Sequence, residues 1–185
     1  MSEFSPREWL SRLRVRAGLF AAVAVLVLAR PTWTSIAIGV VISIAGLAVR
    51  AWASGHLRKE KALAVSGPYR FSRNPLYLGN FVMGIGIVVG AYSWWVLGLF
   101  VIYFAAFYPL IIQREKGRMR ELFPDQYEDY RRRVPSFFPS FFRRRFRSPT
   151  KFSWALYWKN KEYRALAGTL LFWLILSAKI LLLNR

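Results

Sequence analysis

Long apolar stretches alternate with short polar and basic stretches along this chain. A helix needs about 20 residues, at about 1.5 Å of rise each, to cross the hydrocarbon layer of a membrane, so each apolar stretch is a candidate span. The pattern predicts an all-α, polytopic membrane protein with about five transmembrane helices. Their expected ranges are 17–29, 32–53, 76–92, 94–112 and 165–183. Almost no residues separate the third span from the fourth, which predicts a tight antiparallel hairpin.

The residues at the ends of these stretches predict the orientation in the membrane. Aromatic residues gather there, as they do at lipid–water boundaries: Trp33, Tyr92, Trp94, Trp95, Trp154, Tyr157, Trp158 and Tyr163. Of the 28 Lys and Arg residues, 25 lie in residues 1–16, 50–76 and 113–164. Only Arg30, Lys179 and Arg185 lie on the other side. Since basic loops stay in the cytoplasm, we expect the N-terminus and both long polar segments to face the cytoplasm, in a bacterial inner membrane.

Composition removes several classes of function. The chain is 55% hydrophobic with a formal net charge of +19. A nucleic-acid-binding protein of this charge would be polar between its basic stretches, whereas here those stretches are apolar, so we expect no nucleic-acid partner. The absence of cysteine excludes disulfides, thiolate metal sites and thiol nucleophiles. His56 is the one histidine, which argues against a histidine metal site or a serine–histidine–aspartate triad.

The chain divides into three parts on this pattern. Residues 1–49 form an N-terminal transmembrane hairpin, residues 50–140 hold the candidate chemistry, and residues 141–185 combine a basic segment with a last transmembrane helix. The stretch 135–163 is both basic and aromatic, with Phe137, Phe138, Phe141, Phe142, Arg143, Arg144, Arg145 and Arg147. Each basic residue near an anionic leaflet contributes about 1 kcal/mol. We therefore expect this stretch to lie on anionic membrane lipids.

Two polar segments, 55–79 and 113–135, contain motifs that are too specific for ordinary connecting loops. Gly67-Pro68 is a turn signal, and Pro75 biases Asn74 away from helix and starts the third span. Backbone amides freed by these breaks, near Arg73 and Tyr77, suit a polar or anionic ligand.

Glu115 is the acidic residue that calls for an explanation in the second segment. It lies about one turn beyond the membrane boundary, where an isolated carboxylate is costly unless it is paired or used. One interpretation is an ordinary salt bridge to Arg118 along the same helix. The other is a ligand-binding role. Tyr127 and Tyr130, three residues apart, are explained equally well by packing.

Taken together, the two segments resemble the isoprenylcysteine carboxyl methyltransferase family and its phospholipid methyltransferase relatives. That family shows a Leu-x-x-x-Gly-x-Tyr stretch, then Arg-His-Pro-x-Tyr-x-Gly, a helical hairpin, a Glu-rich helix, Phe-Gly-x-x-Tyr-x-x-Tyr and a closing Val-Pro. The matches here, in order, are Leu63, Gly67, Tyr69, Arg73, Pro75, Tyr77, Gly79, Glu115, Phe123, Tyr127, Tyr130, Val134 and Pro135. Order and spacing agree over about residues 50–140.

The resemblance implies S-adenosylmethionine as the cofactor, held on the cytoplasmic side without a Rossmann sheet, and a lipophilic acceptor that enters from the bilayer. By matched position, the cofactor-binding residues are Lys61, Ala62, Leu63, Ala64, Tyr69, Asn74, Pro75, Leu76, Tyr77 and Glu115. A carboxylate such as Glu115 can pair with the ammonium of the cofactor. No residue stands out as a general base. The protein would mainly align donor and acceptor.

Three positions depart from the family pattern. Asn74 replaces a histidine and keeps a hydrogen-bonding side chain, Lys116 replaces a second glutamate, and Ile111 replaces an arginine that relatives use for the substrate. Ile111 removes a charge that would meet a prenylcysteine carboxylate. Arg114 and Arg118 are then the candidate substrate-binding residues. His56 lies outside the matched motifs and fits either the site or a hydrated loop.

Three functions fit these residues. The first is S-adenosylmethionine-dependent methyl transfer to an isoprenylcysteine-like carboxylate or to a lipid amine or oxygen. The second is a nicotinamide-dependent reductase of the sterol-reductase type, which shares a related helical core. The third is an inactive membrane scaffold of the same fold, for which Asn74 and Lys116 argue. Cofactor binding separates the three.

Overall fold

The computed structural model describes residues 6–140 and 150–183, and these residues form helices and no strand. In chain order the elements are α1 (Pro6–Leu28), α2 (Trp33–Ser54), the 3-10 helix η1 (Gly67–Arg70), α3 (Pro75–Ala91), α4 (Trp94–Leu122), α5 (Pro124–Arg133), α6 (Trp154–Lys159) and α7 (Tyr163–Leu183). The all-α fold expected from the sequence is confirmed.

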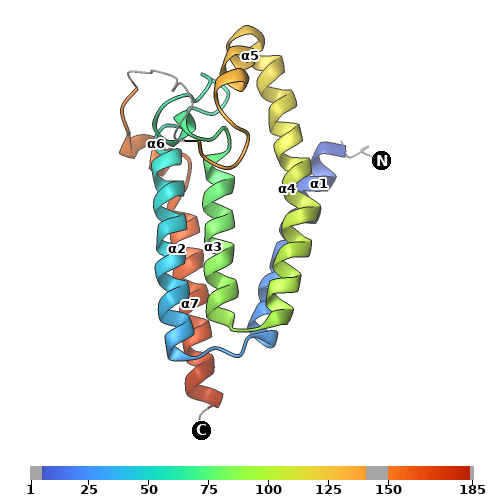
Figure 1. Ribbon diagram of the computed structural model, residues 1–185, viewed down its shortest axis with the longest axis vertical. Helices are drawn as coiled ribbons and strands as arrows, with labels where there is room; N and C mark the ends of the chain where they lie inside the picture. Colours follow the sequence, from blue (N-terminus) through green and yellow to red (C-terminus); the bar gives the residue numbers. More distant parts are fainter. Residues whose placement is uncertain (1–5, 141–149, 184–185) are drawn as a thin grey trace.

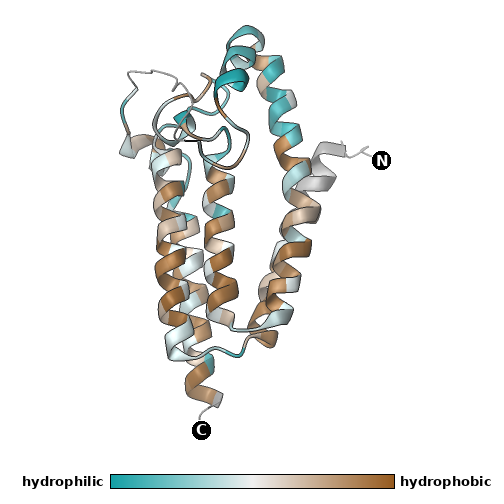
Figure 2. Cartoon of the chain, viewed as in Figure 1, coloured by the Kyte–Doolittle hydropathy of each residue, from teal (hydrophilic) through white to brown (hydrophobic). Residues whose placement is uncertain are grey.

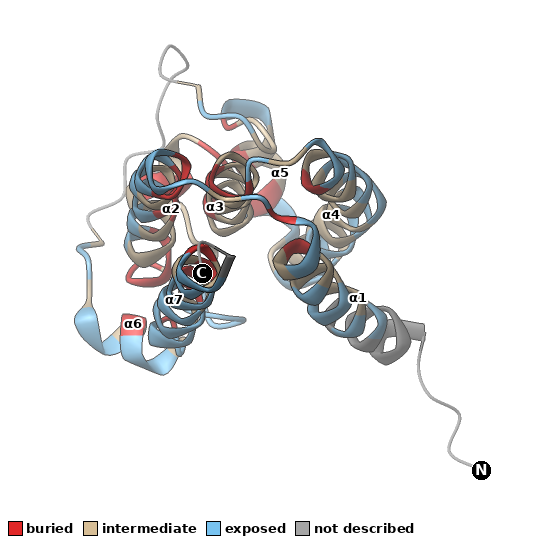
Figure 3. Ribbon diagram, turned by 90° about the horizontal axis from the view of Figure 1, so that it is seen from below, coloured by how far each residue is buried: buried red, intermediate tan, exposed pale blue. Residues whose placement is uncertain are grey.

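Five long helices run along the long axis of the molecule (Figure 1). α2, α3 and α7 stand side by side, and α1 packs along α4 on the other side, as the view along the helices also shows (Figure 3). η1, α5 and α6 gather at one end, together with the loop between α2 and α3 (Figure 1). Hydrophilic residues concentrate at this polar end, and the helices below it are largely hydrophobic (Figure 2).

Three helices are long and apolar enough to cross a membrane: α2, α4 and α7. The apolar part of α1, Arg16–Leu28, and helix α3 are shorter. They coincide with the other two expected spans, so the count of five stays a prediction. Large apolar side chains such as Phe20, Ile102 and Leu174 are exposed. Apolar surface of this extent is typical of helices that face lipid.

α2 and α3 pack closely through glycines on both helices. A Cβ atom on Gly86 would lie 2.6 Å from the carbonyl oxygen of Gly39, and one on Gly46 would lie 2.7 Å from that of Gly79. Real Cβ atoms essentially never come this close to another heavy atom, so these crossings require glycine. A Cβ on Gly90 would lie 2.4 Å from the ring of Trp173 on α7. Gly86 and Gly90, four residues apart, thus let α3 approach α2 and α7 closely.

The predicted tight turn between α3 and α4 is confirmed, because only Tyr92 and Ser93 separate the two helices. Tyr92 ends α3 in the left-handed region, with φ of 48°. The helices then diverge (Figure 1): Gly79 and Gly86 of α3 lie against α2, while Phe81 meets the rings of Phe100 and Phe104 on α4. α4 continues to Leu122, ten residues beyond the end expected at 112. The second polar segment therefore begins as a rigid extension of a membrane-type helix.

Lys179 fastens α7 to the end of α1. Its Nζ atom donates hydrogen bonds of 2.7, 2.9 and 2.7 Å to the carbonyl oxygens of Leu26, Val27 and Ala29. The last carbonyls of a helix lack helical partners, and an ammonium there also interacts favourably with the helix dipole. A lysine near the end of an apolar helix is thus explained as a cap on a neighbouring helix.

α6 lies at the polar end, directly before α7. Trp154 and Trp158 are 66% and 60% exposed on it. Phe141, Phe142, Arg143, Arg144, Arg145 and Arg147, which carried part of the expected contact with anionic lipid, lie outside the described residues.

Candidate functional site

A cavity of about 580 Å³ opens at the polar end between the loop after α2, the start of α3 and the second half of α4. Ligand pockets typically measure about 300–1,000 Å³. The loop and η1 contribute Leu57, Arg58, Lys59, Glu60, Ala62, Leu63, Ala64, Tyr69, Arg73 and Asn74. The helices α2 to α5 and the segment after α5 contribute Arg50, Pro75, Leu76, Tyr77, Asn80, Tyr103, Tyr108, Ile111, Ile112, Glu115, Lys116, Arg118, Met119, Tyr127, Tyr130 and Ser136.

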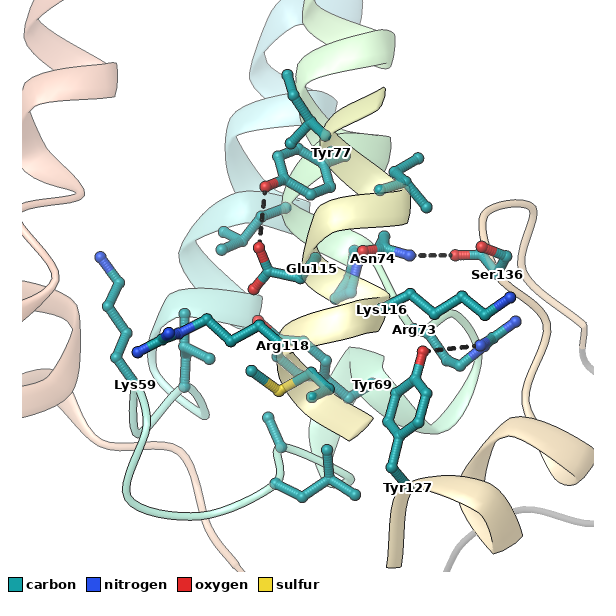
Figure 4. A pocket seen from close by; sticks show the side chains of 18 of the residues that line it. Lys59, Tyr69, Arg73, Asn74, Tyr77, Glu115, Lys116, Arg118, Tyr127 and Ser136 are labelled. Atoms are coloured by element: carbon teal, nitrogen blue, oxygen red, sulfur yellow. Dashed lines mark hydrogen bonds between the residues drawn. The ribbon is translucent and has the colours of Figure 1, made fainter. Parts of the chain in front are cut away.

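Glu115 and Tyr77 meet inside this cavity (Figure 4). The Tyr77 hydroxyl donates to Oε2 of Glu115 at 3.4 Å, and the Tyr77 ring lies edge-on to Tyr108. Among the described residues, the Glu115 carboxylate has no ion-pair partner within 4.0 Å. In so basic a chain, this carboxylate is therefore open to a cationic ligand.

The local salt bridge from Glu115 to Arg118 is not formed. Arg118 instead donates to Oε1 of Glu60, with Nη2 at 2.7 Å, and so joins α4 to the loop after α2. Both side chains are largely exposed, so this pair contributes at most about 1 kcal/mol. Its effect on the site is geometric, because Arg118 and Glu60 both line the cavity.

Arg73 and Asn74 tie the start of α3 to the segment after α5. Nη1 of Arg73 donates to the Tyr127 hydroxyl at 3.0 Å, and Nδ2 of Asn74 donates to the Ser136 carbonyl at 2.8 Å (Figure 4). The Arg73 backbone N–H donates to the carbonyl of Pro135 at 2.9 Å. Nε of Arg73 is buried without a hydrogen-bond partner within the described structure. Asn74 thus makes a structural hydrogen bond that needs no titratable side chain.

Tyr69 and Tyr130 form the buried floor of this end. The Tyr130 hydroxyl donates to the Tyr69 carbonyl at 2.7 Å. Burial raises the pKa of the Tyr69 phenol far above its ordinary value, Glu115 and Glu162 raise it further, and Arg50 lowers it. Burial also raises the pKa of Tyr130. Both phenols are neutral hydrogen-bonding groups at physiological pH. Three charged side chains lie within electrostatic range of Tyr69.

Most residues predicted for the site line the cavity. From the cofactor set these are Ala62, Leu63, Ala64, Tyr69, Asn74, Pro75, Leu76, Tyr77 and Glu115, and from the substrate set Arg118. Lys61 and Arg114 are exposed and do not line it. Arg114 directly precedes Glu115 on α4, and successive helix residues point about 100° apart. Binding by any of these residues stays a prediction.

Several cavity residues were missed from the sequence, above all Arg50 and Asn80. Arg50 had been counted as a loop charge, yet it lies within α2 and donates through Nη1 to Oδ1 of Asn80 on α3. A lone arginine in the last turns of an apolar helix was the available signal, because such charges are usually paired or functional. Tyr103 and Tyr108 gave no signal beyond aromatic packing.

His56 does not line the cavity and is not a hydrated loop residue. It is buried, with Nδ1 2.8 Å from the Ser66 hydroxyl and its ring edge-on to Phe152. The ring fills the space beside Gly67, where a Cβ atom would lie 2.4 Å from it and φ is +55°. Burial lowers the pKa of His56. Its role is to hold the turn that leads into η1.

The described residues define an all-helical fold of membrane type with a cavity at its polar end. A model of the phospholipid methyltransferase family matches residues 19–126. The chain belongs to this family, so the resemblance read from the motifs is confirmed.

Two curated relatives carry names of metal-resistance proteins. The nickel-cobalt-cadmium resistance protein NccN of Alcaligenes xylosoxydans xylosoxydans is 34% identical over 116 residues, which cover 58% of this chain and 53% of the relative. The cobalt-zinc-cadmium resistance protein CzcN of Cupriavidus metallidurans is 32% identical over 141 residues, or 68% of this chain and 64% of the relative. The chain therefore spans between half and two thirds of these relatives. No solved structure matches it. The described residues contain no cluster of three or more metal-ligating side chains.

Proposed function

We propose that this protein transfers a methyl group from S-adenosylmethionine to a lipophilic or membrane-resident acceptor. The observation that carries the proposal is the Glu115 carboxylate, which faces Tyr77 in the cavity without a basic partner among the described residues. A protein of net charge +19 has many cations to offer a carboxylate. A carboxylate kept open in a pocket suits the ammonium of a ligand.

The residues present fit this cofactor. Its amino-acid part carries one ammonium and one carboxylate. Glu115 can accept hydrogen bonds from the ammonium, and Lys59, which also lines the cavity, is a cationic donor for the carboxylate. When bound, S-adenosylmethionine supplies an electrophilic methyl group on a sulfonium. The chain would hold the cofactor in one orientation, and Tyr69 and Tyr77 would act as neutral or weakly polar walls.

The acceptor side of the cavity supports a lipophilic substrate. Tyr103, Tyr108, Ile111 and Ile112 line it from α4, within the helix that is apolar enough to cross a membrane. Ile111 departs from the family pattern given above, which has an arginine at this position, so the acceptor would be bound there by apolar contact. We therefore favour an acceptor whose polar head is an amine or an oxygen other than a carboxylate.

The same proposal includes the orientation. Five spans, with the N-terminus and the cavity on the cytoplasmic side of a bacterial inner membrane, place α6 on an anionic leaflet. Support comes from the concentration of polar residues at one end (Figure 2) and from the exposed Trp154 and Trp158 next to Lys159. Tryptophan and lysine together are typical of helices at the lipid–water boundary.

The names of the relatives suggest a setting for this reaction. If the chain contributes to metal tolerance, it would do so by modifying a lipophilic molecule. Expression of the wild type, but not of a Glu115→Gln variant, should then raise the cobalt concentration that a sensitive bacterium tolerates. Equal protection by both proteins would separate tolerance from methyl transfer.

Calorimetric titration with S-adenosylhomocysteine tests the cofactor directly. Wild-type protein in detergent should bind it saturably. Glu115→Gln should bind about 10- to 150-fold more weakly, because a hydrogen bond to a charged group contributes about 1.5–3 kcal/mol. Glu121→Gln is the matched control: it makes the same change at an exposed position of α4 outside the cavity, and it should bind as the wild type does.

Two results would contradict the proposal. One is the absence of S-adenosylhomocysteine binding to monodisperse wild-type protein. The other is saturable binding of reduced nicotinamide dinucleotide phosphate in its place, which would favour the reductase. If Glu115→Gln and Glu121→Gln lost the same affinity for S-adenosylhomocysteine, Glu115 would not be a ligand-binding residue.

A further inference from the structure

The segment from Thr150 to Glu162 packs against the end of α2, although it lies outside the family-matched residues 19–126. The Ser153 backbone N–H donates to the carbonyl of Gly55 at 3.0 Å. The ring of Phe152 lies against Gly55, where a Cβ atom would be 2.1 Å from it. This glycine ends α2, so the later segment covers the point where the cavity loop begins.

Asn160 completes this contact by serving two carbonyl groups. Its Nδ2 donates to the carbonyl oxygens of Ser54 and Leu57, at 2.9 Å each. The Ser54 carbonyl also accepts from the Leu57 backbone N–H at 3.2 Å, so Asn160 is an additional donor there, and each of its hydrogen bonds contributes about 0.5–1.5 kcal/mol. Leu57 is the first residue of the run Leu57–Glu60 that lines the cavity. Asn160 therefore fixes the start of the cavity wall.

Glu162 makes the second link, to a residue inside the cavity. Nε and Nη2 of Arg50 donate to the two carboxylate oxygens of Glu162 at 2.6 and 3.0 Å. The side chains are only 16% and 7% exposed. Nη1 of Arg50 donates to Asn80, so all three guanidinium nitrogens are engaged. A buried pair of this kind cannot lose one partner without leaving the other charge uncompensated.

The salt bridge between Arg50 and Glu162 also bears on Glu115, the other carboxylate of the cavity. Arg50 and Glu115 line the same cavity, and both act on the phenol of Tyr69, as does Glu162. All three charged groups therefore lie within electrostatic range of one side chain. As long as Glu162 holds Arg50, the Glu115 carboxylate stays without a basic partner among the described residues. Without Glu162, Arg50 becomes an uncompensated cation beside an unpaired carboxylate.

We propose that Glu162 and Asn160 are positioning residues of the cavity: Glu162 keeps Arg50 away from Glu115, and Asn160 fixes the wall formed by Leu57–Glu60. The site is then incomplete without the segment that follows the family-matched region. The choice of ligand for the test rests on the proposed methyltransferase function, but the positioning itself does not.

The ligand test compares S-adenosylhomocysteine binding by Glu162→Gln, Asn160→Ala and the double variant Arg50→Gln/Glu162→Gln. Lys159→Gln, at an exposed position of α6, is the control. We expect Glu162→Gln to weaken binding at least tenfold, because Arg50 then competes for Glu115. The double variant should recover most of that loss, since the competing cation is gone. Lys159→Gln should bind as the wild type does.

Recovery in the double variant is the result that a purely structural role would not produce. If Glu162→Gln and the double variant bind equally weakly, or if Glu162→Gln binds as the wild type does, the competition for Glu115 is refuted. Should Glu162→Gln fail to fold, Glu162→Asp keeps the charge with a shorter reach and should show an intermediate loss of binding. Wild-type affinity in Glu162→Asp would then overturn the proposal.

Hydrogen–deuterium exchange tests the positioning without any ligand. Amides of residues 55–64 should exchange at least tenfold faster in Asn160→Ala and Glu162→Gln than in wild type or Lys159→Gln. Unchanged exchange in both variants would overturn the proposal even if the wild type binds S-adenosylhomocysteine. Faster exchange in a protein that does not bind this ligand would support the positioning and refute the proposed cofactor.

Discussion

Gly79→Ala tests the helix crossing that brings Arg50 and Asn80 together. A Cβ atom on Gly79 would lie 2.5 Å from Cγ of Arg50 and 2.8 Å from the carbonyl oxygen of Gly46. Ordinary van der Waals contact begins at about 3.4 Å, so α2 and α3 would have to separate by about 0.6–0.9 Å. The Gly46 contact is backbone and cannot swing aside. Overpacking of this kind typically costs about 1–3 kcal/mol.

The matched control is Gly117→Ala, where a Cβ atom has no neighbour within 4 Å. Both glycines lie inside helices, so alanine contributes a similar gain of about 0.5–1 kcal/mol in each variant. The difference between the two variants therefore isolates the overlap at Gly79. At about 2–4 °C per kcal/mol for a chain of this length, Gly79→Ala should melt about 2–12 °C below Gly117→Ala.

Fluorescence-detected size exclusion over a temperature series measures the loss of monodisperse protein in detergent. The temperature at which half is lost gives the thermal midpoint of each variant. Equal thermal midpoints for the two variants would mean that α2 and α3 do not approach closely at Gly79. That result would also contradict the hydrogen bond between Arg50 and Asn80. A midpoint of Gly117→Ala below that of the wild type would show that alanine does not stabilise the helix as expected. The difference between the two variants would then no longer measure the steric clash at Gly79 alone.

Two further predictions concern the polar end. Burial lowers the pKa of His56 in the folded state below its unfolded value of about 6.5. The unfolded state therefore binds the proton more readily. The free energy of unfolding has its full value above about pH 6.5 and falls as the pH drops toward the folded pKa. Thermal midpoints between pH 8 and pH 5 should show this loss in the wild type and a smaller one in His56→Gln; equal slopes would contradict the assignment. Tyr130→Phe leaves the Tyr69 carbonyl without the hydroxyl that donates to it, which should cost about 1–3 kcal/mol in unfolding free energy. A wild-type midpoint for Tyr130→Phe would show that another donor serves this carbonyl.

The membrane-type helices could be predicted from the sequence because apolar length is a local property. The ends of α2, α3 and α7 fall within about two residues of the expected ones. The family resemblance assigned Tyr69, Tyr77 and Glu115 to one cofactor site, and all three line the cavity. The end of α4 was misjudged, since a change from apolar to basic residues marks the membrane boundary and not the end of a helix.

The partners of the charged residues could not be predicted, because they depend on how each helix is rotated and on contacts far along the chain. The local rule paired Glu115 with Arg118, whereas Arg118 reaches Glu60, 58 residues away. Arg50 and Glu162 are 112 residues apart. Glu162 was nonetheless visible as a lone carboxylate among lysines and arginines, and a solitary charge of this kind calls for a partner.

The three departures from the family pattern all lie in the cavity, and this bears on whether the protein is active. Asn74, Lys116 and Ile111 line it. Asn74 holds Ser136 by a hydrogen bond that needs no histidine, and Lys116 points away from Glu115 (Figure 4). A scaffold released from function has no reason to keep a carboxylate free of salt bridges among the described residues of so basic a chain, or to pair Arg50 with a buried glutamate. The substitutions leave the architecture of the cavity in place, so in the proposed methyltransferase they would change the acceptor and not abolish the reaction.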